Sequence, residues 1–351
     1  MLKKLLKGCL TIAIATAMAV PAMAIDAKVT GRVRGYLKSS NVKDGRALTE
    51  FEADGRFGGK ITGETDSGWV GVGALEFSVD PDTDPDDVQD SVKHRHNYIG
   101  VSNEMIDVKI GRQYPYGVAQ GMSYMVGPGW MSWWAGEGPD YNYNGGYGDM
   151  LTVGITQVGV TAIIGMDNIN DANEADATGD QYLLTTFGVV FSKSFGPVDV
   201  GATYIVQSTS IDDEYSGDAV KKTTYDGSSL SDFAFGVKFN ITDLIGVALN
   251  YDMTTFQSGV NNADPEATMN YELWGDIGFA EGMGVSVGYG NWSTNDGTDN
   301  NTVKTFINVG FSAKVDVAKL FVTYKATTEV DDDTNKDAAE SLIVFGGQVG
   351  F

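Results

Sequence analysis

Alternation of apolar and polar residues is the feature of this 351-residue sequence that most restricts its fold. Between Ser231 and Ile241 every second residue is apolar, and the residues between are mostly polar or glycine. A period of two places successive side chains on opposite faces of a β-strand. The same pattern returns along the whole chain, and long helical periodicity is absent. The sequence therefore predicts an all-β fold.

Sixteen alternating segments can be counted, and the connections between them alternate in length. The segments begin near residues 27, 49, 68, 93, 106, 147, 158, 181, 197, 230, 244, 267, 283, 302, 318 and 340. Short turns fall at places such as Phe195–Gly196 and Glu281–Gly282, whereas long polar connections cover ranges such as 80–92 and 211–230. An even strand number with short turns on one side and long loops on the other is typical of an outer-membrane β-barrel.

A closed barrel satisfies the backbone in a membrane, because hydrocarbon offers no partner to an unpaired amide and a closed sheet has no open edge. The alternation then places apolar side chains toward lipid and polar side chains toward the lumen. Sixteen strands enclose an aqueous channel rather than a packed interior. The alternative is a soluble β-sandwich that buries the apolar face, although a soluble protein of this length usually contains some helix.

The N-terminal sequence predicts a secretory signal peptide at residues 1–24, followed by a barrel at 25–351. Three lysines precede an apolar run at 9–20, and Ala22–Ala24 supplies the small-residue cleavage pattern. Cleavage would remove Cys9, the only cysteine, so disulfide and thiol chemistry are not expected. No later stretch approaches 18 consecutive apolar residues, so no membrane-spanning helix is predicted.

The charge distribution excludes nucleic acid as a partner and bears on whether metal ions bind. A net charge of -23 excludes binding to nucleic acid. More than half of the 47 acidic residues lie in the long connections, with runs at Asp80–Asp87 and Asp331–Asp337. Such runs could bind divalent cations weakly at the surface, or could simply be solvated, self-repelling loop tips. Lys336 occupies the position where a calcium loop needs glycine, so no defined metal site and no cofactor are predicted.

Basic residues fall on the polar faces of three early segments, where they are expected to point into the lumen. They could line a pore or form structural ion pairs with carboxylates on the same faces. The residues with this polar parity are Arg32, Arg34, Arg56, Lys93, Arg95 and Asn97, and they alternate with Val33, Phe57, His94 and Tyr98.

A stretch of 33 residues from Tyr114 to Gly146 has no periodicity, and it is long for a connection in a compact domain. It contains three tryptophans (Trp130, Trp133 and Trp134) and two acidic residues (Glu137 and Asp140). The tryptophans could pack this loop against the inner wall, or they could form a stacking platform for passing solutes.

Ordered short motifs within about the first 150 residues resemble those of the general bacterial porins, the trimeric sixteen-stranded channels of Gram-negative outer membranes. "TGRVRGYL" resembles the family's first strand, and "GRFGGKITGET" with "GWVGVGALEF" its second and third. "KHRHNYIGVSN" with "VKIGRQYPYG" is similar to the fourth and fifth strands. The final "VFGGQVGF" ends in the terminal phenylalanine of the family. From 158 to 340 only the alternating pattern matches.

The resemblance implies that the third loop, 114–146, folds inward and narrows the channel. Arg32, Arg56 and Arg95 match the family's basic ladder on the wall, which faces acidic residues on this loop. The family's proline-glutamate-phenylalanine-glycine run is absent, and Glu137 and Asp140 are the nearest acidic candidates.

The resemblance also implies how the chain is assembled and where it is located. Arg112 matches an arginine that serves subunit contacts, which implies a homotrimer. Phe351 matches the signal that the barrel-assembly machinery recognises. Outer-membrane lipid and lipopolysaccharide are the implied surroundings, with the cell outer membrane of a Gram-negative bacterium as the location.

The residues give no sign of an enzyme. The sequence contains no G-x-S-x-G motif, and its two histidines, His94 and His96, lie on one segment beside Arg95. We predict a channel for passive diffusion of small hydrophilic solutes and ions, with a mild preference for cations because carboxylates are in excess. The alternatives are a substrate-specific porin, for example for sugars, that uses the loop aromatics, and a structural or adhesive surface barrel.

Overall fold

The computed structural model describes residues 25–41, 47–79, 92–113, 148–170, 181–211, 229–257, 266–295, 301–331 and 338–350. The other residues lie outside this description, among them the predicted signal peptide at 1–24 and the loop at 114–146. No helix in the described ranges is long and apolar enough to cross a membrane.

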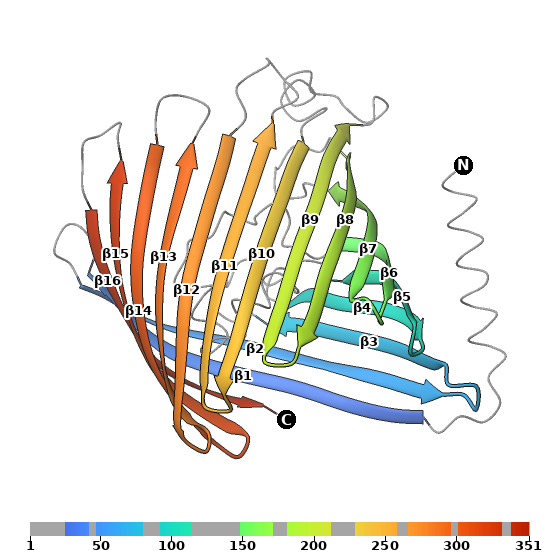
Figure 1. Cartoon of the computed structure of the whole chain (residues 1–351), viewed down its shortest axis with the longest axis horizontal. Helices are drawn as coiled ribbons and strands as arrows, with labels where there is room; N and C mark the ends of the chain where they lie inside the picture. Colours follow the sequence, from blue (N-terminus) through green and yellow to red (C-terminus); the bar gives the residue numbers. More distant parts are fainter. Residues whose placement is uncertain are drawn as a thin grey trace.

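Sixteen antiparallel strands form a closed barrel in which each strand pairs with its neighbours in sequence and the last pairs with the first (Figure 1). The strands are β1 (Ile25–Asn41), β2 (Ala47–Glu64), β3 (Val70–Val79), β4 (Val92–Ser102), β5 (Ile106–Gln113), β6 (Gly148–Ile155), β7 (Val160–Asn170), β8 (Gln181–Phe195), β9 (Val198–Ile211), β10 (Ser229–Thr242), β11 (Ile245–Gln257), β12 (Glu266–Ala280), β13 (Met283–Asn295), β14 (Asn301–Val315), β15 (Ala318–Asp331) and β16 (Ala338–Gly350). Each predicted segment starts within two residues of the first residue of a strand, so the predicted strand number and order are confirmed.

The short turns at one end of the barrel depend on residues that adopt a left-handed backbone. Gly196 between β8 and β9, Gly282 between β12 and β13 and Asp316 between β14 and β15 have φ of 64°, 72° and 55°. A Cβ atom added at Gly282 would lie 2.6 Å from the carbonyl oxygen of Lys314. Glycine is therefore required there both by conformation and by space.

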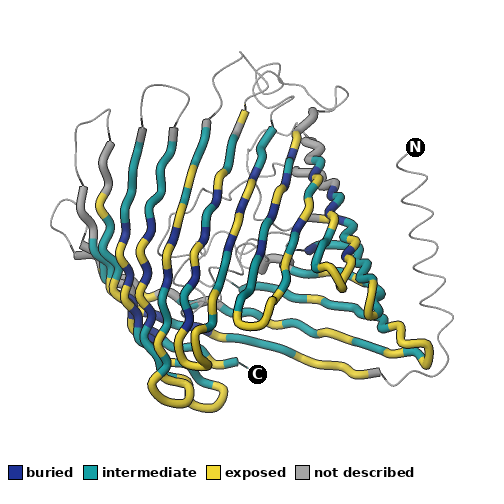
Figure 2. Tube along the Cα trace, in the orientation of Figure 1, coloured by how far each residue is buried: buried dark blue, intermediate teal, exposed yellow. Residues whose placement is uncertain are grey.

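Most of the outer face of the barrel is apolar. Val29, Phe51 and Phe345 are 72%, 68% and 60% exposed, and large apolar side chains are exposed on the same face of nearly every strand. In the middle of β10 to β13, exposed residues alternate with buried or intermediate ones (Figure 2). A surface of this extent would aggregate in water, whereas it matches the hydrocarbon of a bilayer. The soluble sandwich is therefore excluded.

The inner face carries two packed apolar clusters and large rings that cover glycines on the next strand. Trp274 lies over Gly288, its register partner, and Phe306 covers Gly290 in the same way. A Cβ atom at these glycines would lie 2.5 Å and 2.2 Å from the rings. Rings of this size cover the bare backbone of a neighbouring strand and help to hold the two strands together. The first cluster comprises Tyr36, Ala248, Trp274, Phe306, Phe321 and Val344, and the second Met150, Ile163, Val190 and Ile205.

Candidate functional site: the inner wall of the barrel

Among the described residues, several polar side chains of the inner wall have hydrogen-bonding atoms without a hydrogen-bond partner. Asn308 is fully covered, yet neither its amide oxygen nor its amide nitrogen makes a hydrogen bond. Three more buried atoms also make no hydrogen bond: the hydroxyl oxygens of Thr203 and Thr323 and the amide oxygen of Gln207. Buried polar groups left without a partner cost about 1–3 kcal/mol each. The inner wall therefore carries polar groups even where neighbouring side chains cover it.

Arginines gather on the inner face where β1 and β2 pair. Arg32 of β1 and Arg56 of β2 are register partners, so their guanidinium groups leave adjacent strands on the same face. Arg34 lies two residues further along β1, on the same face, and is 5% exposed. Its guanidinium carbon lies over the Tyr36 ring, 5.4 Å from the ring centroid. The predicted inward direction of β1 is confirmed by the exposure of Val33 on the opposite face. The wall at β1 and β2 therefore carries three arginines, and the register partner of Arg34 on β2 is the acidic Asp54.

The prediction for β4 is wrong in part, because a β-bulge interrupts the alternation there. Glu76 of β3 pairs with His96, but Phe77 pairs with His94, which leaves Arg95 without a register partner on β3. A bulge inserts one residue and changes the face of those beyond it. The Arg95 side chain itself lies outside the description, so its place in a basic ladder stays a prediction.

Beyond the bulge, the faces of β4 are the reverse of those expected. Asn97 is exposed on the outer face together with Ile99, and its register partner Leu75 is exposed as well. His96 and Tyr98 share the inner face, where their rings meet edge to face at 6.1 Å. Between residues 96 and 98, β4 therefore presents aromatic rings to the lumen, and the amide of Asn97 lies on the outer face.

Carboxylates gather on the inner face of three adjacent strands, β10 to β12. Asp232, Asp252 and Glu272 are 3%, 8% and 4% exposed. Thr254 donates a hydrogen bond to Asp232 at 3.1 Å, and the Trp274 indole nitrogen donates one to Glu272 at 2.9 Å. The alternation places all three on the polar face, but only the strand register brings them together, so sequence reasoning did not single them out.

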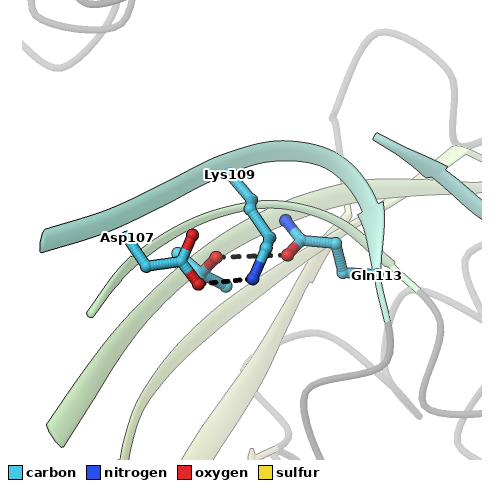
Figure 3. A network of polar contacts seen from close by, with 4 residues as sticks. Asp107, Lys109 and Gln113 are labelled. Carbon is cyan, nitrogen blue, oxygen red and sulfur yellow. Dashed lines mark hydrogen bonds and ion pairs between the residues drawn. The ribbon is translucent and has the colours of Figure 1, made fainter. Parts of the chain in front are cut away.

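A polar network holds the wall where the chain leaves β5 for the segment 114–146 (Figure 3). Lys109 forms an ion pair with Asp107. Gln113 donates a hydrogen bond to the Met150 carbonyl at 3.2 Å and accepts one from Thr152 at 3.1 Å. These bonds join β5 to β6 on the inner face at the base of the predicted constriction loop. The loop residues Trp130, Trp133, Trp134, Glu137 and Asp140, and the terminal Phe351, lie outside the described residues.

Arg112 lies on the outer face of β5, opposite in direction to Gln113. Its register partners are Asn97 on β4 and Asp149 on β6, which makes a polar row across an otherwise apolar exterior. Its Nε atom is buried and makes no hydrogen bond within the described part of the chain. Arg112 therefore does not belong to the inner wall.

The outer face of β1 to β4 is hollowed next to this polar row. A shallow apolar groove of about 360 Å³ forms where Gly59 and Gly73 leave space between larger side chains. Val29, Ile61, Leu75 and Ile99 border it. The outer surface of these strands is thus uneven, with a groove that another side chain could fill.

A sequence profile described as Gram-negative porin matches residues 10–348. The chain belongs to this family. As a porin, it is a channel of the Gram-negative outer membrane that crosses the bilayer with its strands, rather than an enzyme. The described residues contain no group of histidine, cysteine or acidic side chains that could hold a metal ion.

Solved structures support the fold of this porin. An anion-selective porin from Comamonas acidovorans aligns with a TM-score of 0.66 at 15% identity, covering 93% of this chain and 100% of the other. OmpF of Salmonella typhi, in complex with daunomycin, aligns with a TM-score of 0.64 at 16% identity, covering 93% and 97%. The outer-membrane channel DcaP of Acinetobacter baumannii gives 0.61 at 16% identity, covering 93% and 97%. No curated protein sequence matches the chain.

Proposed function

We propose that this porin is a passive diffusion channel for small hydrophilic solutes and ions, with a mild preference for cations. The observation that carries the proposal is the closed barrel of sixteen strands, which turns its large apolar side chains outward and is wide enough to enclose an aqueous channel. Carboxylates outnumber basic residues by 47 to 24, and a field of that sign concentrates cations at the channel mouths.

The reversal potential of the purified porin in a planar bilayer under a salt gradient tests the ion preference. We expect a sign that corresponds to a cation-to-anion permeability ratio slightly above one. A ratio below one would contradict the cation preference while leaving the channel function intact.

The segment 114–146 is proposed as an inward-folding constriction loop, with Glu137 and Asp140 toward the lumen. Its start is supported by the Gln113 network, which holds the chain on the inner face where the segment begins. Residues 1–24 are proposed as a signal peptide and Phe351 as the signal for the barrel-assembly machinery. Any divalent cations would bind weakly at the acidic loops.

A homotrimer in outer-membrane lipid and lipopolysaccharide is the proposed assembly. The outer face of β1 to β5 supports it, because an apolar groove and the polar row through Arg112 lie side by side there. A neighbouring subunit would fill the groove and remove the polar row of Asn97, Arg112 and Asp149 from contact with lipid.

A sugar-specific porin is the second candidate, supported by the aromatic residues Trp130, Trp133 and Trp134 in the proposed loop. Saturable conductance that a sugar blocks competitively would favour it over general diffusion. If Trp133→Ala and Trp134→Ala change the conductance but not the solute preference, the tryptophans pack the loop and do not select the solute. A structural or adhesive barrel would replace both candidates if the reconstituted porin showed no conductance.

A further inference from the structure

We propose that residues 25–31, the first part of β1, form a docking edge for an extended peptide segment of a periplasmic protein. The segment adds to the sheet as one more strand, a mode of recognition in which main-chain hydrogen bonds give affinity and side chains give specificity. The short turns of porin barrels face the periplasm, and residues 25–31 lie at that end of the barrel. This inference goes beyond the channel function and does not depend on it.

The edge exists because β1 continues beyond the end of β16, the strand that closes the barrel (Figure 1). β1 pairs with β2 along its whole length, from Ile25 to Asn41, whereas its pairing with β16 begins only at Arg32. Among the described residues, 25–31 therefore have a strand on one side only. Open edges of this kind are templates for pairing with a further strand.

Every second residue of this segment directs its backbone groups toward the open side. A Cβ atom added at Gly350 of β16 would lie 3.6 Å from the carbonyl oxygen of Gly31, so this carbonyl points away from β2. The direction of the backbone groups alternates along a strand. Ala27 and Val29 have the same parity as Gly31, so their N–H and C=O groups also point to the open side. No strand in the described part of the chain pairs with them there.

The exposure of the segment shows that a partner can reach it. Asp26, Ala27, Lys28 and Val29 are all exposed, so both faces of the strand meet solvent at this end. An open edge does not occur in hydrocarbon, because its amides would lack partners. This part of β1 therefore lies outside the apolar layer of the bilayer, where a periplasmic peptide has access to it.

The side chains define the chemistry of the peptide. Asp26 and Lys28 lie on one face of the strand, and neither forms an ion pair with another described residue. Lys60, the register partner of Lys28, adds a second exposed positive charge on this face. Directly opposed residues of opposite charge stabilise a strand pair. The matching segment has an acidic residue opposite Lys28, a basic residue opposite Asp26, and apolar residues beside Ala27 and Val29.

Two fluorescent peptides of identical composition test the inference on the purified, folded porin in detergent. The peptide Val-Thr-Val-Glu-Val-Lys-Val, aligned antiparallel to residues 25–31, places glutamate opposite Lys28 and lysine opposite Asp26. The control Val-Thr-Val-Lys-Val-Glu-Val places like charges opposite each other at both positions. We expect fluorescence polarisation to give a Kd about fivefold lower, or less, for the first peptide than for the control.

Two variants of the porin show whether binding occurs at this edge. D26K/K28D exchanges the two charges and should reverse the preference between the peptides. Ala27→Pro removes one N–H from the open side, in a strand position where proline is tolerated, and should raise the Kd of the first peptide about tenfold.

The outcomes are independent of the conductance that tests the channel function. Equal affinity of the wild type for both peptides, or no binding up to their solubility limit, would overturn the inference. An unchanged preference in D26K/K28D would overturn it as well. If Ala27→Pro does not fold, the charge exchange decides alone.

Discussion

Strand pairing determines which charged residues of the inner wall lie next to each other. Arg32 and Arg56 lie next to each other because β1 and β2 are in register at these positions, and Arg34 adds a third guanidinium on the same face. Like charges placed side by side repel each other unless opposite charges lie nearby, and Asp54 is the register partner of Arg34 on β2. The position of the arginines on the lumenal face fits a role in attracting anions or slowing cations.

Substitution of Arg56 tests this role at the scale of one residue. In Arg56→Gln we expect the cation-to-anion permeability ratio to rise by about twofold, because one positive charge leaves the lumen. The measurement is again the reversal potential under a salt gradient. Arg112→Gln is the matched control, since Arg112 lies on the outer face and its removal should leave the ratio unchanged. A fall in the ratio of Arg56→Gln would contradict the assignment.

At the scale of the element, strand pairs depend on rings that lie over glycines. Trp274 covers Gly288 so closely that a Cβ atom would meet its ring at 2.5 Å. Gly275, one residue from Trp274 and on the other face, has nothing within 4 Å of an added Cβ atom. Lack of space therefore excludes a side chain at position 288, whereas position 275 has room for one.

A pair of alanine substitutions tests this difference. Gly288→Ala should displace the Trp274 ring and lower the free energy of unfolding by about 1–3 kcal/mol, the usual cost of overpacking. Gly275→Ala should be nearly neutral or slightly stabilising, because alanine suits a strand better than glycine where space is free. Urea unfolding of the purified porin in detergent, followed by tryptophan fluorescence, gives both values. Equal stability of the two variants would refute the packing role.

The elements show clearly how far sequence reasoning reaches. Strand positions were predictable because one parity is apolar in most segments, and hydrocarbon on the outside requires it. On β4 the run from Lys93 to Asn97 is polar at every position, so no apolar parity marks the outer face and the bulge at Arg95 could not be predicted. The row of carboxylates on β10 to β12 was hidden for another reason, since alternation gives the face of a residue but not its neighbour on the next strand.

At the scale of the whole molecule, the outer surface is uneven in a way that bears on assembly. Most of the exterior is apolar, whereas the outer face of β4 to β6 carries Asn97, Arg112 and Asp149 in one register row. A charged side chain is costly in contact with hydrocarbon unless it has a partner. A subunit interface at these strands would remove that cost.

Loss of the arginine should therefore weaken the oligomer. In Arg112→Gln we expect the trimer to dissociate at a lower temperature than the wild type, as judged by native and semi-denaturing gels after stepwise heating. The barrel itself should remain folded, with an unchanged circular dichroism spectrum. Identical dissociation of variant and wild type, or a wild type that is monomeric throughout, would argue against an interface at β5.

The single-channel conductance of the purified porin in a planar bilayer shows whether the barrel is open, since a closed barrel of sixteen strands is expected to hold a continuous column of water. We expect discrete conductance steps that are ohmic at low voltage and rise in proportion to the bulk salt concentration. Bilayers that stay silent although folded protein has inserted would contradict it.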